Sequence, residues 1–298
     1  MRNAFIEELV KLAVEHSNIA LVVGDLGFSV IEPFADQFPD RFINAGVAEQ
    51  NMVGLAAGMA SEGYHVFTYS IANFPTFRCA EQLRNDVDYH KLPVTTVAVG
   101  GGVAYGSLGY SHHAVQDYAL MRCMPNMLIA APGDPMEVRA CLRYLVENPQ
   151  PSYLRIGKAG EKNYHKDVPE VRPGVWLPQS IKNEKKIILA TGATIESAFN
   201  LRNVNSEYED YSIYSLPIWG MKSKDIQETQ VLDGSRIVTI EEHLTDGGFG
   251  SWLMESSTLF LKKNIEIKLI SLNPKICGMV GSQKYLLNCS DREDDICN

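Results

Sequence analysis

Short, wholly apolar segments alternate with amphipathic segments along this chain, and the alternation limits the folds that it can adopt. Residues 19–23, 65–70 and 93–99 are apolar or β-branched runs, and each lies between segments with helical periodicity. Strands that are apolar throughout are typical of parallel sheets, because helices in the crossover connections cover both faces. The pattern therefore predicts an α/β fold with mainly parallel sheets flanked by helices.

A polar segment divides this alternation into two parts. Residues 161–183 are rich in Lys, Glu, Pro and Gly, and strands and helices alternate again after them. We therefore expect a first domain over residues 1–160, a linker over 161–183 and a smaller α/β domain over 184–298. The last eight residues hold four acids and one base, which is typical of a solvated acidic tail.

Composition argues against several classes of protein. The formal net charge is −9, which is unfavourable for a nucleic-acid surface. None of the six cysteines forms a Cys-x-x-Cys pair, so we expect reduced thiols rather than a zinc site or a disulfide framework. The N-terminus lacks the apolar run of a signal peptide, and no run of about 18 apolar residues could span a membrane. These features are typical of a cytoplasmic protein.

Polar and glycine residues gather in the segments that follow predicted strands, at residues 24–29, 70–77, 100–113 and 241–250. Ligands of open parallel sheets bind at the carboxyl ends of strands, so these loops are expected to border the functional site. The three glycines at residues 100–102 are not a dinucleotide fingerprint, because the Gly-x-Gly-x-x-Gly spacing is absent.

Glu49 is the first candidate for a catalytic residue. It begins a predicted helix that is otherwise apolar for three turns. The residues alone leave two interpretations open. Glu49 is either an N-terminal helix charge, which stabilises a helix by about 0.3–1 kcal/mol, or a buried general acid–base group. The local pattern favours the helix charge, although the small and apolar neighbours of Glu49 would suit a buried acid.

Two pairs of residues are further candidates. His112 and His113 lie in a glycine-rich loop before a predicted helix. The residues alone leave three interpretations open: polar residues at the helix start, a metal-binding pair, or groups that transfer a proton to a substrate oxygen. A metal would need a third ligand, and none has clear spacing. Phe74 and Phe77 precede a helix predicted over residues 78–89. Such a pair usually packs in the core, and the alternative is stacking on a flat heterocycle.

The order and spacing of five short segments carry further information. They are residues 24–26 (Gly-Asp-Leu), 42–52 (Phe-Ile-Asn-Ala-Gly-Val-Ala-Glu-Gln-Asn-Met), 82–86 (Gln-Leu-Arg-Asn-Asp), 111–117 (Ser-His-His to Asp) and 124–127 (Met-Pro-Asn-Met). Together with residues 240–250, they resemble the transketolase family from residue 2 to about residue 273. The resemblance implies a pyrimidine-binding domain with the thiamine diphosphate-binding fold, followed by a transketolase C-terminal-like domain.

The resemblance also implies catalytic and cofactor-binding roles. Glu49 matches the glutamate that protonates the aminopyrimidine of thiamine diphosphate and helps to deprotonate its thiazolium carbon. Phe74 or Phe77 matches the aromatic residue that stacks on the pyrimidine. Asp25 matches an acid near the thiazolium, and His112 matches a histidine that contacts substrate oxygens.

A second set of matches concerns the substrate. The residues that match or adjoin substrate-binding positions of the family are Arg2, Ser29, His112, His113 and Lys158. Three positions depart from the classical pattern. Lys158 stands where an arginine would make a forked contact, Gly100 replaces a histidine, and Leu108 replaces an aspartate that reads the acceptor's stereochemistry. These departures predict a modified or differently bound sugar rather than an ordinary pentose phosphate.

The family holds the diphosphate and its metal through a Gly-Asp-Gly motif and a later asparagine, and this chain contains no such motif. The resemblance therefore implies that the diphosphate and Mg²⁺ are held by a separate N-terminal transketolase subunit, so that no metal ligands are expected here. Two such pairs would form an α2β2 heterotetramer, with the cofactor at the interface. Gly54, Ala57 and Gly58 would allow close helix packing across a symmetric interface.

The resulting hypothesis is a subunit of a heteromeric, thiamine diphosphate-dependent transketolase. It would transfer a two-carbon ketol unit between sugar phosphates or modified sugars. The nearest alternative is the β subunit of a 2-oxo acid dehydrogenase E1-type decarboxylase, which shares the two domains. A deoxyxylulose-type synthase, which usually has both halves on one chain, and a non-catalytic partner subunit also stay open.

Overall fold

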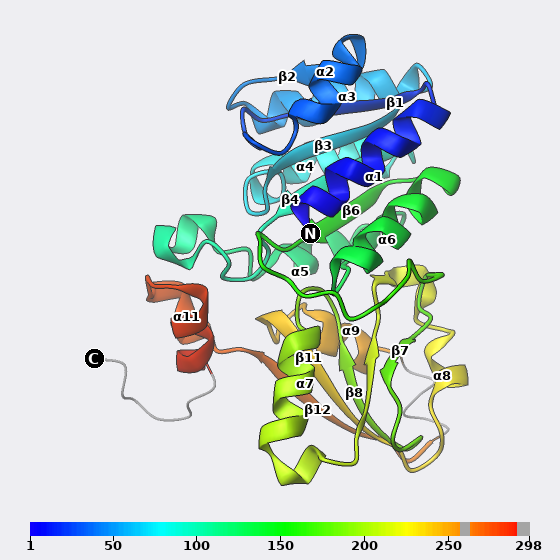
Figure 1. The fold of residues 1–298 in the computed structure, drawn as a ribbon, viewed down its shortest axis with the longest axis vertical. Helices are drawn as coiled ribbons and strands as arrows, with labels where there is room; N and C mark the ends of the chain where they lie inside the picture. The colour runs from blue at the N-terminus through cyan, green and yellow to red at the C-terminus, as the bar shows by residue number, and fades with distance from the viewer. Residues whose placement is uncertain (257–262, 291–298) are drawn as a thin grey trace.

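The computed structural model describes residues 1–256 and 263–290, which form two sheets with flanking helices (Figure 1). The larger sheet has the spatial order β10 (Ile218–Trp219), β5 (Leu128–Ala130), β6 (Ser152–Ile156), β4 (Val94–Val99), β3 (His65–Ile71), β1 (Ile19–Val23) and β2 (Phe42–Asn44). Its neighbouring strands are parallel except for the pair β10–β5. The predicted acidic tail at residues 291–298 lies outside the described residues.

Successive residues of the buried strands point to opposite faces of this sheet. Leu21 and Val23 of β1 pack on the face covered by α1 (Arg2–Glu15) and α6 (Pro135–Glu147). Val22 packs on the other face, against α3 (Glu49–Ser61). Because helices cover both faces, the inner strands are buried along their length and consist mostly of apolar or β-branched residues. The predicted α/β fold is confirmed, and so are its mainly parallel sheets.

The smaller sheet has the order β12 (Glu266–Leu272), β11 (Arg236–Leu244), β8 (Lys186–Ala190), β9 (Ser212–Ser215) and β7 (Leu177–Ser180). Its strand pairs are parallel except for β7–β9. Helix α7 (Ile195–Val204) packs on one face, where Ala198 lies in a buried cluster with Ile188. Helix α9 (Phe249–Met254) covers the other face, where its Trp252 lies in a buried cluster with Ile187.

Two strands take positions that the sequence pattern did not indicate. Strand β10 follows β9 in the chain but pairs with β5 of the larger sheet, with Ile218 opposite Ala130. Strand β7 lies inside the segment expected to be a linker. The second half of the chain therefore completes the first sheet instead of only following it.

A buried ion pair of the first half of the chain lies at the boundary with the second half. Asp117, the first residue of α5 (Asp117–Arg122), is 0% exposed, and its Oδ2 atom lies 2.7 Å from Nε of Arg155. The hydroxyl of Tyr153 donates a hydrogen bond to the same oxygen at 2.7 Å. Arg155 also donates to the carbonyl oxygens of Ala114 and Glu242, at 2.7 and 2.8 Å. Arg155 thus joins the two halves of the chain, and Asp117, which the sequence grouped with the two histidines, is its buried counter-ion.

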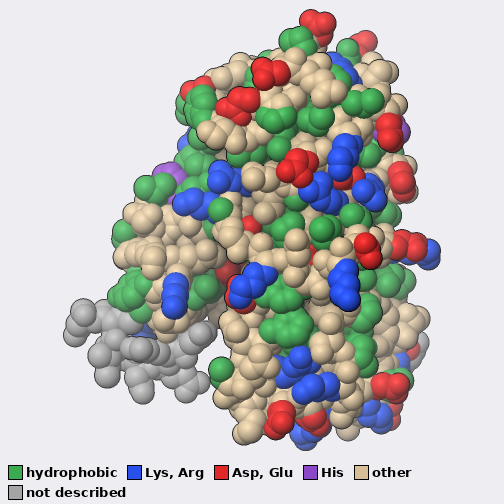
Figure 2. Space-filling model, in the orientation of Figure 1, with side chains coloured by type: hydrophobic (Ala, Val, Ile, Leu, Met, Phe, Trp, Pro, Cys, Tyr) green, Lys and Arg blue, Asp and Glu red, His purple; other side chains and the backbone are tan. Residues whose placement is uncertain are grey.

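Acidic and basic side chains are interspersed on the face of the molecule seen in Figure 2. That face therefore has no continuous basic surface of the kind that the phosphates of a nucleic acid require. Within the described part of the chain, every helix is too short or too polar to cross a lipid bilayer.

Two buried histidines should make the fold sensitive to acid. Burial lowers the pKa of His65 and of His243 to about 4. Above pH 6.5 neither state is protonated, whereas between pH 6.5 and 4 the unfolded chain binds protons that the folded chain does not, so stability falls as the pH falls. At pH 5 each histidine should cost about 2 kcal/mol. When the pH is lowered to 5, the free energy of unfolding in urea should therefore fall by about 2 kcal/mol less for His65→Gln than for the wild type.

The exposed His90 provides the matched control, because His90→Gln should keep the wild-type pH dependence. Equal acid sensitivity of His65→Gln and the wild type would contradict the assignment.

Candidate active site

Three of the predicted loops meet at one edge of the larger sheet. Val23 pairs with Tyr69, and Ile71 pairs with Val99, so β1, β3 and β4 end side by side. The loops that begin at residues 24, 72 and 100 therefore leave the sheet together, as the carboxyl ends of parallel strands must. Helix α3 also begins at this edge, and its first residue is Glu49.

Glu49 is a buried acid at the start of a helix. Its side chain is 1% exposed, and it is the acid in the first turn of α3. Its Oε1 atom accepts a hydrogen bond from the hydroxyl of Ser70 at 3.3 Å. Its Oε2 atom lies 2.5 Å from Nη1 of Arg78, a side chain that is 45% exposed. The site thus contains a carboxylate that is nearly inaccessible and a cation that reaches it from the surface.

Phe74 and this carboxylate share Arg78 as a neighbour. The Arg78 guanidinium carbon is 4.7 Å from the centroid of the Phe74 ring. The other neighbour of that ring is His112, in an edge contact at 5.0 Å. Phe77 is 47% exposed and begins a short 3-10 turn, Phe77–Cys79. Arg78 thus links Glu49 to Phe74, whose ring contacts His112, and the roles of both phenylalanines stay predictions.

The helix predicted over residues 78–89 is not a continuous α-helix. The 3-10 turn is followed by α4 (Ala80–Gln82) and by a π-helical segment, Leu83–Asp88. Irregular winding of this kind often occurs at functional sites. It starts the segment with a tight turn, from which Arg78 reaches Glu49.

The two histidines of the neighbouring loop have different surroundings. His112 is half-buried, and its Nδ1 atom lies 3.0 Å from the hydroxyl of Ser111. The Asn73 side chain donates a hydrogen bond to the Ser111 carbonyl at 2.8 Å, which ties the loops together. His113 is 1% exposed, and its Nε2 atom lies 3.5 Å from the Gly106 carbonyl. Burial lowers the pKa of His113, whose substrate-binding role stays a prediction.

The end of the described chain supports this loop. Helix α11 (Gln283–Ser290) places Leu286 in a buried cluster with Val103 and Val115. Just before it, the Gly281 amide donates a hydrogen bond to the Gly106 carbonyl at 3.1 Å. The second half of the chain thus helps to position His112, although it supplies no side chain to the contacts around Glu49 described above.

Two of the predicted phosphate-binding residues lie together beyond His112. The Arg2 Nε atom donates a hydrogen bond to the Lys158 carbonyl at 2.5 Å. The Lys158 ammonium lies 4.6 Å from the centroid of the Tyr105 ring, which in turn is 6.5 Å from that of His112. A Cβ atom at Gly100 would overlap the Tyr105 ring. Tyr105, which sequence reasoning missed, therefore fills the space beside the position where the family pattern has a histidine.

Asp25 and Ser29 occupy strained backbone positions in the first loop. Their φ angles are 55° and 65°, which are uncommon for residues other than glycine. The Asn44 amide donates a hydrogen bond to Asp25 Oδ1 at 2.9 Å, and Glu32 accepts one from the Ser29 amide at 2.7 Å. Both side chains are exposed, and Leu108 is 54% exposed. The predicted roles of Asp25 and Ser29 stay open.

The arrangement fits the pyrimidine end of thiamine diphosphate. A flat ring with ring nitrogens and an amino group needs an aromatic neighbour and a buried carboxylate, and Phe74 and Glu49 supply these. Within residues 1–256 and 263–290, no group of three or more His, Cys, Asp or Glu side chains is placed to hold a metal ion.

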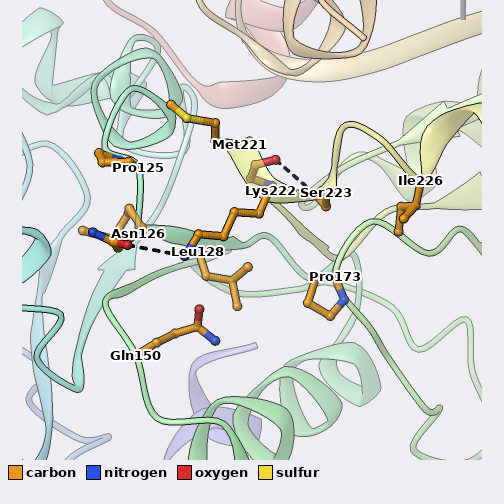
Figure 3. A pocket seen from close by; sticks show the side chains of 11 residues that line it. Pro125, Asn126, Leu128, Gln150, Pro173, Met221, Lys222, Ser223 and Ile226 are labelled. Carbon is orange, nitrogen blue, oxygen red and sulfur yellow. Dashed lines mark hydrogen bonds between the residues drawn. The ribbon is translucent and has the colours of Figure 1, made fainter. Parts of the chain in front are cut away.

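A cavity of about 140 Å³ lies at the opposite edge of the sheet, near the amino ends of β5 and β6 (Figure 3). Its lining includes Leu128, Gln150 and Lys222, and Lys222 Nζ lies 3.4 Å from Asn126 Oδ1. The cavity is thus separated from Glu49 by the length of the strands and takes no part in the candidate site.

The match to known families covers the half of the chain that holds this site. Residues 1–160 match the family described as transketolase, pyrimidine binding domain. The chain belongs to the transketolase family. Two transketolase relatives match this chain over most of their own length as well. A protein of Methanocaldococcus jannaschii, provisionally named transketolase C-terminal section, is 34% identical over 86% of this chain and 81% of its own. One subunit of the apulose-4-phosphate transketolase of Phocaeicola vulgatus is 33% identical over 86% and 82%.

A solved structure gives the same assignment. It is described as a split gene transketolase, inactive β4 tetramer, and has a TM-score of 0.81 and 29% identity over 97% of this chain and 92% of its own. The predicted family is therefore confirmed, together with the transferase class that it implies.

Proposed function

We propose that this chain is the pyrimidine-binding subunit of a two-chain transketolase, which transfers a two-carbon ketol unit between sugar phosphates or modified sugars. The observation that carries the proposal is the buried carboxylate of Glu49, which Arg78 links to the ring of Phe74, with His112 on the same ring. The names of two relatives support it, since one is a single subunit of a transketolase and the other is a split transketolase.

Each residue of the site then has a chemical role. When bound, thiamine diphosphate supplies an acidic thiazolium C–H group whose carbon carries the two-carbon unit. Glu49 exchanges a proton with the pyrimidine ring, and its burial excludes competing water. The Ser70 hydroxyl orients Glu49 Oε1. Ser111 lies beside Nδ1 of His112, which leaves Nε2 as the nitrogen that meets a substrate oxygen.

Arg2 and Lys158 form the anion-binding end of the substrate site. A lysine there binds phosphate as a point charge and not as a fork, and Tyr105 offers a hydroxyl beside Gly100. This set suits a sugar that is bound differently from an ordinary pentose phosphate.

A separate chain would hold the diphosphate and Mg²⁺, in an α2β2 assembly with this one. A β4 tetramer described as inactive supports the need for such a partner. On α3, positions 54 and 58 are open, and Leu55 between them is 37% exposed. This small, apolar face suits close packing against another subunit. Ala57, which the sequence grouped with these glycines, is 6% exposed and packs inside the chain instead.

The test is reconstitution. This chain should be mixed with a candidate diphosphate-binding chain, thiamine diphosphate and Mg²⁺, and ketol transfer followed from a panel of phosphorylated and unphosphorylated ketoses. Activity is expected only in the complete mixture, and an ordinary pentose phosphate should be a poor donor. Decarboxylation of a 2-oxo acid without ketol transfer would replace this proposal with the dehydrogenase-subunit alternative.

A further inference from the structure

Arg78 is the cation that pairs with Glu49, and the proposed chemistry does not use it. Its Nη1 atom lies 2.5 Å from Glu49 Oε2, and within the described residues it is the ion-pair partner of that carboxylate. Burying an unpaired carboxylate is costly, so the free chain needs a cation or a proton at this place. Arg78 meets that need from a side chain that is 45% exposed.

The position of the guanidinium is as informative as its charge. The group is flat, carries several N–H donors and stands 4.7 Å from the Phe74 ring centroid while it binds Glu49. An aminopyrimidine that stacked on Phe74 and shared a proton with Glu49 would make the same two contacts. Arg78 and the pyrimidine therefore compete for one place.

We propose that Arg78 is a displaceable counter-ion, which occupies the pyrimidine position in the free chain and must release Glu49 before the cofactor binds. This inference rests on the proposed function, because it assumes that the pyrimidine binds at Glu49. The two partners differ in their freedom to move. Glu49 is 1% exposed and begins the 13-residue helix α3, whereas Arg78 has a long, half-exposed side chain on a short turn.

Displacement has a consequence that other roles of Arg78 would not have. Substitution of Arg78 should destabilise the free chain, which loses its counter-ion, and should strengthen cofactor binding, because the binding-competent state is then more populated. A purely structural residue would weaken both properties when replaced, and a residue that binds the cofactor would weaken the affinity.

The experiment uses the reconstituted complex with Mg²⁺. Isothermal titration calorimetry should give the dissociation constant of thiamine diphosphate for the wild type, Arg78→Gln and Arg78→Lys. If Arg78 occupies the site in roughly nine molecules of ten, Arg78→Gln should bind about tenfold more tightly. Arg78→Lys, which keeps the charge but loses the flat stacking group, should fall in between. Thermal unfolding of the free Arg78→Gln chain should show a lower midpoint than that of the wild type.

Arg84 provides the matched control. It is exposed, lies less than two helical turns further along and bonds to its neighbour Asn85, so Arg84→Ala should change neither property. Equal or weaker cofactor binding by both Arg78 variants overturns the inference and leaves the proposed function intact. A wild-type complex that binds no thiamine diphosphate overturns the proposed function, and this inference with it.

Discussion

Replacing Glu49 by glutamine should lower the ketol-transfer rate of the reconstituted enzyme by about 10²- to 10⁴-fold, the usual contribution of a positioned acid–base group. Glutamine keeps the volume of the buried side chain and can still accept a hydrogen bond from Ser70. It cannot exchange a proton with a ring nitrogen. The defect should therefore appear in kcat at saturating thiamine diphosphate and substrate.

The matched control for Glu49→Gln is Glu81→Gln, which changes an exposed acid of the neighbouring segment. It should keep at least half of the wild-type rate. A Glu49→Gln complex within threefold of the wild-type kcat would exclude Glu49 as the proton-exchange group. The non-catalytic-subunit alternative would gain support if Glu49→Ala also kept its activity.

The class of fold could be predicted because its cause is local. A strand covered by helices on both faces is buried at every position, and β1 and β4 show this as five or six consecutive apolar or β-branched residues. Strand β10 could not be found in this way. It has two residues, and it exists because Ile218 and Trp219 pair with β5, almost ninety positions earlier in the chain. Such a short run has no periodicity to read.

The candidate site was predictable where a family pattern marks the residue, as at Glu49 and His112. It was not predictable where tertiary structure creates the role. Arg78 looks like any charge on the solvent side of an amphipathic helix, and only the 3-10 turn at its position brings it to a carboxylate 29 residues earlier. Tyr105 was hidden for a related reason. The glycines before it lack the spacing of a dinucleotide-binding motif, and their sequence gives no sign that Gly100 makes room for the tyrosine ring.

The second large effect concerns the buried Asp117–Arg155 ion pair, whose arginine also bonds to the second half of the chain. Arg155→Met should lower the free energy of unfolding by about 3–5 kcal/mol, because it leaves the carboxylate of Asp117 buried without its cation. The variant also loses hydrogen bonds to the carbonyl oxygens of Ala114 and Glu242, one from each half. Urea unfolding followed by tryptophan fluorescence would measure the change, since Trp219 and Trp252 are buried near this boundary.

A second arginine between the halves shows why burial decides the size of this effect. Arg122 bonds to Glu255 at 2.7 Å, but the Glu255 side chain is 47% exposed, so water can solvate the charge that remains when Arg122 is replaced. Arg122→Met should therefore cost no more than about 1 kcal/mol. The double variant Asp117→Leu/Arg155→Met should recover part of the loss, because it removes both buried charges. If Arg155→Met and Arg122→Met destabilise equally, the Asp117–Arg155 pair does not contribute to stability as its burial indicates.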